Sequence, residues 1–335
     1  MNRLKFGVFL PKKNHNIDTN LVYAHSPLTN RLPNQEIEKF LGLISDSGVF
    51  ELIEIPNFND VIIVNASVLY KDTNLSNLDT FFWYGEIGRE NGIYSLDVLK
   101  ALSQTTKVIP NPYSYEAGLD KYTSHMLLKR KGINVSDLIL LSSSNVHLAQ
   151  PILEEWGCGL LKPRKGGFGK GVTLISSFPM LRDIVEYVDM KNFENTGTSY
   201  SGGILLERYY ENSIDKFVST TLIDGEIMYG YRKRTSKLAD LGNGYQKIYD
   251  FNGIGGEVDI CEVLPEHEKQ ALPASNVLGS EIIGFDMIWH KDRPIIVDEN
   301  TFPGLYIDLF KQQGISLAHK MYNLILKHSG ISHVY

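Results

Sequence analysis

Short apolar runs alternate with stretches of helical spacing along the first third of the chain. Four runs have the length and composition of strands: Leu4–Leu10, Phe50–Ile55, Asp60–Asn65 and Lys107–Ile109. The spacing of apolar residues predicts helices over Gln35–Ser47 and Ser95–Ser103. Strands that alternate with helices are typical of an open, mostly parallel α/β sheet. No G-x-G-x-x-G follows the first strand, which argues against a dinucleotide site there.

The pattern changes at Pro110-Asn111-Pro112, after which the chain becomes richer in strands. Helices are expected over Tyr115–Lys131, Asn145–Glu155, Met180–Val188, Pro265–Ser280 and Ser316–Lys327. Strands are expected over Leu138–Leu141, Gly159–Lys162, Val172–Ile175, Gly203–Glu207, Phe217–Ile223 and Glu226–Arg232. The glycine-rich stretch Lys237–Gly256 is expected to be a mobile loop or a linker. The aromatic cluster Phe81–Glu86 indicates either packing at a contact or a substrate wall.

A β-branched run near the C-terminus, Ile295–Asn300, ends in carboxylate and amide side chains. Residues two apart share a face of a strand, so Asp298 and Asn300 point the same way. A hairpin turn at His290–Arg293 would bring Asp286, from the preceding apolar segment, to the same place. These three side chains are oxygen ligands of the kind that Mg²⁺ binds. The alternative is a buried strand with a polar exit into a Pro-Gly turn.

A second segment joins cations to a glycine-rich turn. The turn contains Gly166, Gly167, Phe168, Gly169 and Gly171. Glycines let backbone amides approach phosphate oxygens, and Lys162 at the end of the preceding strand supplies a fixed positive charge. The segment lacks the Walker A spacing and enters a strand instead of a helix. The alternative is a glycine-rich hairpin with solvated lysines.

A third apolar strand ends in Glu207-Arg208-Tyr209-Tyr210. Its carboxylate and backbone groups can meet an adenine edge, and Asp215 beyond it can accept hydrogen bonds from ribose hydroxyls. The alternative is a strand end with a solvated glutamate and no role in nucleotide binding. Arg232 and Arg234 close a later strand and either clamp phosphates or form a solvated cationic face.

The composition is that of an ordinary globular protein, with 43% hydrophobic and 21% charged residues in 335. A net charge of -6 argues against binding to bulk nucleic acid or to a membrane surface, because both need a basic face. No run approaches the ~18 apolar residues of a membrane span, and none has the form of a signal peptide. Cys158 and Cys261 lack metal-site spacing and indicate reduced thiols, so we expect a cytoplasmic protein. The nine histidines are scattered and are expected to be structural or surface groups.

Taken in this order, the segments resemble the ATP-grasp superfamily of carboxylate–amine ligases, which includes D-alanine–D-alanine ligase, glutathione synthetase and ribosomal-protein glutamate ligase. The family's early lysine is matched by Lys121 in Asp120–Ser124, its second lysine by Lys162 and its hinge glutamate by Glu207. An acid followed by E-x-N-x-x-P-G closes the family signature, and Asp286 with Asp298–Gly304 fits it.

Two departures from the family pattern matter. Asp298 replaces the usual glutamate, and Glu299 would bind the metal instead if the strand register differed. We prefer Asp298, because Glu299 points to the opposite face. Phe217 stands where relatives with the sequence D-x-R carry an arginine.

The resemblance implies an α/β (α+β) ATP-grasp fold in three parts. Residues 1–110 would form a Rossmann-like pre-ATP-grasp domain, 111–210 a helical segment with a β-rich lid, and 211–335 a C-terminal subdomain with the metal site. It also implies that Lys121 and Lys162 hold the phosphates of ATP, with Mg²⁺ or Mn²⁺ as the metal. Arg232 and Arg234 would stabilise the transferring phosphoryl group, with Lys162 contributing.

The implied activity is amide formation through an acylphosphate, with release of ADP and phosphate. The expected substrate is an amino acid or a peptide, and a carrier protein is a further option, as is a homodimer. Other readings on the same scaffold are a carboxylate–thiol ligase, a small-molecule kinase and a nucleotide-binding regulator without turnover.

Overall fold

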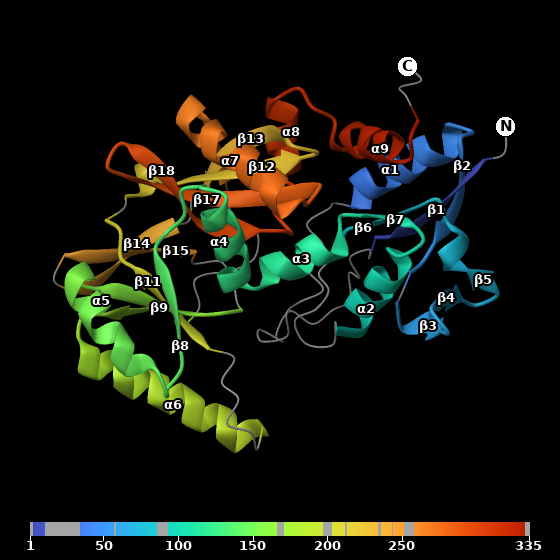
Figure 1. Ribbon diagram of the computed structural model, residues 1–335. Coiled ribbons are helices and arrows are strands. Elements are labelled where there is room, and N and C mark those ends of the chain that lie inside the picture. Colours follow the sequence, from blue (N-terminus) through green and yellow to red (C-terminus); the bar gives the residue numbers. More distant parts are fainter. Residues whose placement is uncertain are drawn as a thin grey trace.

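The computed structural model describes residues 3–10, 34–56, 58–85, 93–165, 171–196, 203–211, 213–233, 236–242, 244–250 and 258–331. Figure 1 shows an elongated molecule with the N-terminal sheet at one end, the other main sheets toward the opposite end, and helix α3 (Pro112–Leu119) between them. The α/β fold class predicted from the sequence is confirmed.

The N-terminal sheet is fully parallel, in the order β2-β1-β6-β7. Its strands are β1 (Leu4–Phe9), β2 (Phe50–Glu54), β6 (Thr80–Trp83) and β7 (Lys107–Ile109). Helices α1 (Asn34–Asp46) and α2 (Ile93–Leu102) pack with it around one apolar core. The predicted parallel sheet is therefore confirmed.

The strand expected at Asp60–Asn65 exists, but it belongs to a separate small sheet. β3 (Val61–Val64) pairs with β4 (Ser67–Tyr70), and β4 pairs with β5 (Thr73–Asn74), all antiparallel. Asn65 and Ala66 have φ of 49° and 67°, the left-handed conformation of a tight hairpin turn. The turn reverses the chain at once, so β3 cannot join the parallel sheet.

The aromatic cluster forms the centre of the N-terminal sheet. Phe81 and Phe82 are completely buried in β6, and the Tyr84 hydroxyl donates to the Pro303 carbonyl at 2.6 Å. The Tyr84 and Phe302 rings lie 4.4 Å apart between centroids. The cluster therefore packs the N-terminal sheet against the turn that contains Phe302 and Pro303, as the packing interpretation predicts.

A second, antiparallel sheet has the order β10-β9-β11-β8. Its strands are β8 (Leu138–Leu141), β9 (Gly159–Pro163), β10 (Thr173–Ile175) and β11 (Ile204–Arg208). Helices α5 (Gln150–Trp156) and α6 (Phe178–Thr196) cover its apolar face. The helix expected over Asn145–Glu155 begins with a 3₁₀ turn, Val146–Ala149, because Pro151 suits only the first turn of an α-helix.

The C-terminal sheet has the order β16-β13-β12-β17-β18 and is antiparallel throughout. Its strands are β12 (Val218–Ile223), β13 (Glu226–Lys233), β16 (Val258–Cys261), β17 (Ile282–His290) and β18 (Arg293–Asn300). Helices α4 (Lys121–Arg130) and α7 (Pro265–Leu278) cover one face, with Leu128, Ala271 and Phe285 in the shared core.

The single helix expected over Tyr115–Lys131 is two helices. Asp120 ends α3 and caps α4, since its carboxylate accepts from the Tyr122 amide at 3.1 Å. An aspartate favours this capping role over a place inside a helix. The break places Lys121 in the first turn of α4.

The expected loop Lys237–Gly256 is wrong over most of its length. β14 (Ser236–Gly242) and β15 (Tyr245–Asp250) pair as an antiparallel hairpin. Gly244, with φ of +82°, serves its turn, so the glycines mark a hairpin connection here. Residues 251–257 lie outside the described part of the chain.

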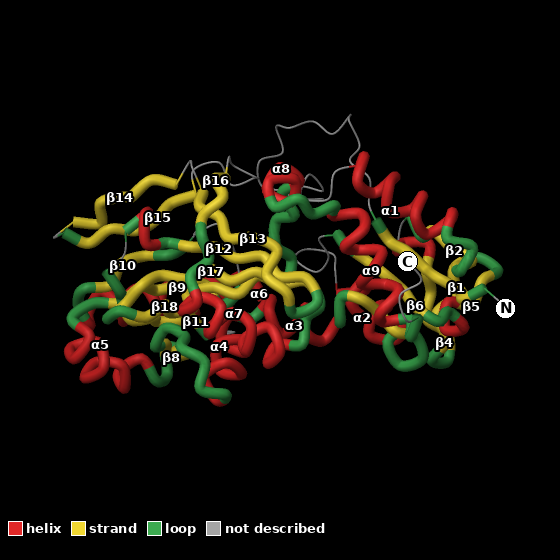
Figure 2. The backbone as a smooth tube through the Cα atoms, turned by 90° about the horizontal axis from the view of Figure 1, so that it is seen from above, coloured by secondary structure: helices red, strands yellow, loops and turns green. Residues whose placement is uncertain are grey.

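The last helix belongs with the first sheet. α9 (Leu317–His328) packs on α1, and Figures 1 and 2 both show the two helices side by side. Leu317, Met321 and Ile325 are buried in the N-terminal core. Each main sheet lies inside one of the three predicted residue ranges. Helices α8 (Ile307–Gln312) and α9 belong to the third range, but their apolar residues pack in the core of the first.

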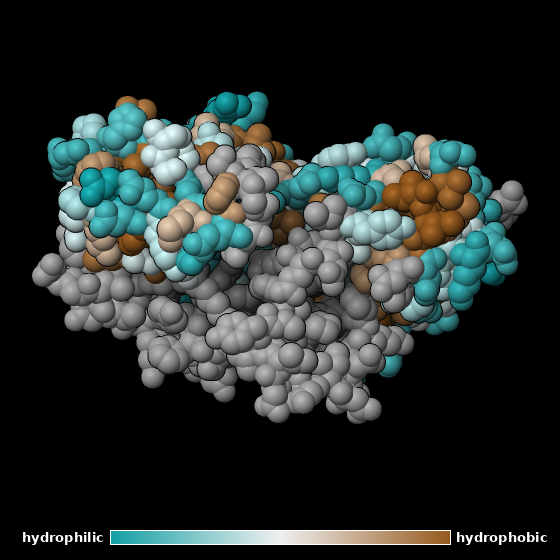
Figure 3. Space-filling view, turned by 90° about the horizontal axis from the view of Figure 1, so that it is seen from below, coloured by the Kyte–Doolittle hydropathy of each residue, from teal (hydrophilic) through white to brown (hydrophobic). Residues whose placement is uncertain are grey.

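The surface is mixed in polarity. Figure 3 shows a gathering of apolar residues at the N-terminal end of the molecule, where β3 exposes Ile62, Ile63 and Val64. Among the helices that the structure describes, none is both long and apolar enough to cross a membrane.

Candidate active site

The β17–β18 hairpin builds the predicted metal site. Lys291 and Asp292 adopt φ of 47° and 64°, which confirms the hairpin turn at His290–Arg293. The strand register places Asp298 directly opposite Asp286. A bulge after Asp286 absorbs one extra residue of β18, so both carboxylates share one face of the sheet. Asn300, two residues beyond Asp298, faces the same way.

Two carboxylates directly opposite each other repel, so this face needs positive charge. The Lys121 ammonium forms an ion pair with Asp298, and the Ser219 hydroxyl donates to Asp286 at 2.6 Å. Burial alone would raise the pKa of Asp298, but Lys121 outweighs it and holds that pKa below its usual value. Asp298 is therefore kept as a hard anionic oxygen ligand.

The donor set fits Mg²⁺. Two carboxylates and an amide oxygen leave positions for phosphates and water, which is how Mg²⁺ is commonly bound beside a nucleotide. Among the described residues, no group of three His, Cys, Asp or Glu side chains offers a metal site built of protein ligands alone. A metal ion held by these side chains would need phosphate or water oxygens to complete its coordination.

Glu299 points away from the ligand face. It pairs with Phe285 in the register, and its side chain is buried beneath α4. His125 Nδ1 lies 2.9 Å from its Oε1. This placement supports Asp298 over Glu299 as the metal ligand.

Lys162 and Glu207 lie on adjacent strands, β9 and β11, and form an ion pair at 2.6 Å. The second carboxylate oxygen of Glu207 accepts from the Ser136 hydroxyl at 2.8 Å. Since Glu207 is buried and both its oxygens are bonded, its carboxylate is not presented to solvent. The next two backbone amides, of Arg208 and Tyr209, donate to the carbonyls of Asp137 and Cys158 at 2.8 and 3.4 Å.

An apolar cluster lies on the ligand face beyond the acids. Tyr210, Phe217, Ile288 and Ile295 pack together, with Val297 against them. Ile288 is two residues from Asp286, so this surface continues along the same side of β17. The Tyr210 hydroxyl donates to Asp137 at 3.0 Å, and burial with that neighbouring charge raises the pKa of Tyr210 to about 12. Phe217, which stands where some relatives carry an arginine, therefore packs in an apolar cluster.

The strand leading into the glycine-rich turn is tied to α4. Arg164 forms an ion pair with Asp120, and the Lys121 amide donates to the Arg164 carbonyl at 3.2 Å. Gly171 follows with φ of +75°. The predicted nucleotide residues Gly166, Gly167, Phe168 and Gly169, and the predicted catalytic Arg234, lie outside the described residues.

The structure does not bring Arg232 to the acids. Tyr231 pairs with Ser219, the register partner of Asp286, so Tyr231 shares the ligand face. Side chains alternate along a strand, which puts Arg232 on the opposite face. Its buried Nε has no hydrogen-bond partner among the described residues. This placement gives no support to a role for Arg232 at the transferring phosphoryl group.

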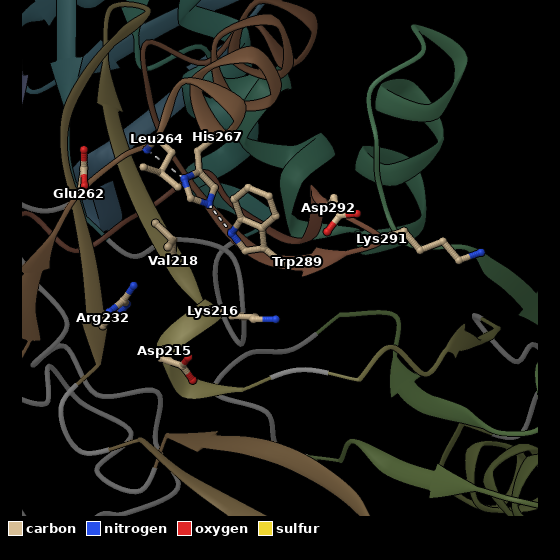
Figure 4. Close-up of a pocket in the computed structure, with 10 residues that line it drawn as sticks. All are labelled: Asp215, Lys216, Val218, Arg232, Glu262, Leu264, His267, Trp289, Lys291 and Asp292. Carbon is tan, nitrogen blue, oxygen red and sulfur yellow. Dashed lines mark hydrogen bonds between the residues drawn. The ribbon is translucent and has the colours of Figure 1, made fainter.

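Arg232 and Asp215 instead line a pocket of about 360 Å³ on the side of the sheet that α7 covers (Figure 4). Its other lining residues are Lys216, Val218, Glu262, Leu264, His267, Trp289, Lys291 and Asp292. The Trp289 indole donates to His267 at 3.1 Å on one wall. Asp215, in the 3₁₀ turn Ile214–Lys216, is exposed at the edge of this pocket.

Sequence reasoning missed the buried polar residues that support the site. Ser124, His125, Ser136 and Glu299 are all buried and hydrogen-bonded to one another or to Glu207. The Asp120-Lys121 pair was a local signal for a helix start. Nothing local marks Ser136 as a partner of Glu207, which is 71 residues away.

Comparison with known proteins gives a consistent answer. Residues 118–325, more than half of the chain, match the RimK-like ATP-grasp domain. The chain is 24% identical over 242 residues to a tetrahydromethanopterin:alpha-L-glutamate ligase of Methanocaldococcus jannaschii, covering 71% of this chain and 76% of that one. It is also 24% identical over 228 residues to a probable alpha-L-glutamate ligase of Desulfotalea psychrophila, covering 68% of this chain. The chain spans 41% of the length of that second relative.

Solved structures share the fold. A D-alanine–D-alanine ligase from Bacillus anthracis, complexed with ATP, superposes with a TM-score of 0.63 at 19% identity and covers 98% of this chain and 97% of its own. A RimK domain protein from Sphaerobacter thermophilus gives a TM-score of 0.59 at 13% identity, covering 95% of this chain and 98% of its own. The ordered lysines, the strand-end glutamate and the paired acids thus stand in the fold that the sequence match indicates, and the chain belongs to the RimK-like ATP-grasp family.

Proposed function

We propose that this protein is an ATP-dependent ligase that joins a carboxylate to an amine through an acylphosphate. The observation that carries the proposal is the opposed pair of carboxylates, Asp286 and Asp298, with Lys121 of α4 in an ion pair with Asp298. In such a site the carboxylates would bind the metal cation, and the lysine would neutralise negative charge on the triphosphate. Phosphoryl transfer needs this neutralisation and alignment more than a protein nucleophile.

Each residue has a role in this proposal. Lys121 and Lys162 bind phosphate oxygens of ATP, and the apolar cluster of Tyr210, Phe217 and Ile288 offers a flat surface for the adenine. Asp286, Asp298 and Asn300 hold Mg²⁺, which when bound offsets the negative charge of the phosphates.

The chemistry proceeds in two displacements. A carboxylate oxygen of the first substrate attacks the γ-phosphorus of ATP, and the bond to the β-phosphate oxygen breaks to release ADP. The amine of the second substrate then attacks the acylphosphate carbonyl and expels inorganic phosphate, with loss of the amine proton. The cationic lysines stabilise the charge that develops on the phosphate oxygens in both steps.

An amino acid or a peptide is the proposed substrate class. The relatives named above are glutamate ligases by name, and another solved structure of this fold, the ATP-grasp ligase PsnB, is complexed with a precursor peptide. Tyr306 and Asp308, after the signature turn, are the candidate residues for reading the substrate amine. The Tyr306 amide donates to the Tyr229 hydroxyl oxygen at 3.1 Å, which fixes the start of this segment.

The test is incubation of the purified chain with Mg·ATP and pools of amino acids and short peptides. We expect phosphate and ADP release that requires both a carboxylate and an amine, and a product lighter than their sum by one water. ADP formation with a phosphorylated product and no amide would replace the proposal with a kinase. Tight Mg·ATP binding without release from any pool would replace it with a nucleotide-binding regulator or a ligase for a macromolecular acceptor.

A further inference from the structure

A buried series of hydrogen bonds connects the sheet β10-β9-β11-β8 to β18, the strand that carries Asp298 and Asn300. Lys162 bonds to Glu207 at 2.6 Å, and Ser136 bonds to Glu207 at 2.8 Å. His125 Nε2 lies 2.9 Å from the Ser136 hydroxyl oxygen, and its Nδ1 lies 3.1 Å from Glu299 Oε2. His125, Ser136 and Glu299 are 2%, 1% and 5% exposed. The hydrogen bonds between these three side chains therefore lie in the protein interior, away from solvent.

Counting protons fixes the state of His125. An ionised carboxylate can only accept hydrogen bonds, so Glu207 and Glu299 act as acceptors while they carry their charge. Ser136 has one hydroxyl proton, and it donates that proton to Glu207. His125 must then donate from Nε2 to Ser136 and from Nδ1 to Glu299, so the ring carries both protons. The resulting imidazolium also compensates the negative charge of Glu299, whose Oε1 lies 2.9 Å from Nδ1.

We propose that His125 is a positioning residue that fixes β18 relative to the Lys162–Glu207 pair. The metal ligands and the phosphate-binding lysine can then bind the same nucleotide. This inference rests on the proposed function. Glu299 lies between Asp298 and Asn300 in the sequence, so anchoring its side chain under α4 fixes the backbone of both ligands. Ser136 carries the connection to Glu207 and through it to Lys162.

The α4 helix makes the connection rigid. His125 is one turn beyond Lys121, and Ser124 beside it donates to Glu299 Oε2 at 3.0 Å. One short helix thus carries the lysine that pairs with Asp298, the hydroxyl that bonds Glu299 and the imidazolium that reaches Ser136. A shift of β18 relative to β9 would break at least one hydrogen bond in the buried interior, which is costly.

The experiment compares His125→Gln with wild type for ATP affinity in the presence and absence of Mg²⁺, by calorimetric titration. Glutamine keeps one hydrogen bond but loses the charge and the second donor. We expect the gain in ATP affinity that Mg²⁺ provides to fall roughly tenfold, as is usual when a residue that orients metal ligands is changed. ATP affinity without Mg²⁺ should change much less, a split that general loosening of the fold would not produce.

His267→Gln is the matched control. His267 is equally buried, at 1% exposed, but it contacts Leu264 and Trp289 on the α7 side of the sheet. Its substitution should leave the Mg²⁺ dependence unchanged. If His125→Gln fails to fold, Ser136→Ala tests the same connection, because it cuts the link to Glu207 and keeps the His125–Glu299 pair.

The possible results separate the two proposals. Wild-type protein that does not bind Mg·ATP overturns the proposed function and this inference together. Wild-type protein that binds Mg·ATP, with the same Mg²⁺ dependence in folded His125→Gln or Ser136→Ala, overturns the positioning role alone. An equal loss in His267→Gln would also overturn it, since the effect would then be general to buried histidines.

Discussion

At the scale of single residues, the lysines of the candidate site already face anions. Lys121 pairs with Asp298 and Lys162 with Glu207, and both lysines are mostly buried. The free energy needed to remove these ammonium groups from water is therefore met during folding. Binding of a triphosphate then exchanges one anionic partner for another, in a site whose donors are already oriented.

Substitution of Asp298 by asparagine tests the metal assignment. The side chain keeps its size but loses the charge that pairs with Lys121, and we expect turnover to be abolished while the fold is kept. ADP release and the melting temperature measure the two effects. Asp183→Asn, at an exposed carboxylate on α6 away from the proposed ligands, should leave turnover within about twofold, as surface charges contribute little. Normal ADP release by Asp298→Asn would rule out this residue as a ligand.

Substitution of Lys162 by alanine tests the nucleotide assignment. A hydrogen bond to a charged group contributes about 1.5–3 kcal/mol, so ATP affinity should fall roughly tenfold to a hundredfold. Calorimetric titration with ATP measures the change. Lys165→Ala, at the exposed lysine three residues on, is the control for general loss of positive charge. Equal affinities of wild type and Lys162→Ala would remove Lys162 from the site.

At the scale of elements, the site depends on how closely α3 approaches the end of β18. Gly118, one turn before Lys121, has no side chain, and a Cβ there would collide with the Thr301 side chain. Thr301 in turn donates to the Tyr115 carbonyl at 3.3 Å. The residue after Asn300 therefore packs directly on the helix that precedes Lys121.

Gly118→Ala should destabilise the protein by about 1–3 kcal/mol, the usual cost of overpacking. Adding Thr301→Ala should recover part of that loss, because it removes the atoms that the new methyl group meets. Denaturant unfolding measures both. In contrast, Gly42→Ala in α1, with open space around it, should stabilise the protein by about 0.5–1 kcal/mol. Additive losses in the double variant would contradict the proposed collision.

At the scale of the whole molecule, ion pairs connect the C-terminal sheet to the last helix. Asp224, in the β12–β13 turn, bonds to Lys327 at 2.6 Å and to His328 at 3.1 Å. Lys320 bonds to Glu226 in the same way. Since α9 packs on α1, these pairs join the N-terminal and C-terminal units.

Asp224→Asn should lower the free energy of unfolding by up to about 1 kcal/mol at neutral pH. Burial would raise the pKa of Asp224, but Lys327 and His328 outweigh it and lower that pKa below 3.8. The stabilisation is therefore present above pH 3.8 and is lost as the pH falls through the folded-state pKa. Asparagine also accepts the φ of 56° at this position, so the variant tests charge alone.

Denaturant unfolding at several pH values measures the difference between the Asp224→Asn variant and wild type, which should shrink as the solution becomes acidic. Glu226→Gln, at a more exposed carboxylate, should show a smaller difference throughout. A constant difference down to low pH would show that the charge of Asp224 is not its source.

The sequence predicted best what is local. Asp286, Asp298 and Asn300 were predicted to converge because alternation and a four-residue turn determine a hairpin within 15 residues. The face of Arg232 was not predictable in the same way, since it depends on pairing with β12 and through it with β17. The burial of Glu207 depends likewise on Ser136 from another element. The break at Asp120 had a local signal, the capping preference of aspartate, which the helical spacing around it obscured.

The packing of α9 on α1 has a consequence for synthesis of the protein. A ribosome makes the chain from its N-terminus, so the N-terminal sheet emerges more than 200 residues before the helix Leu317–His328 that completes its core. The nascent N-terminal unit must wait with an apolar face uncovered until the last helix leaves the exit tunnel. We therefore expect the N-terminal unit to complete its core only after this helix has been synthesised, and to depend on chaperones during translation more than a domain that is self-contained.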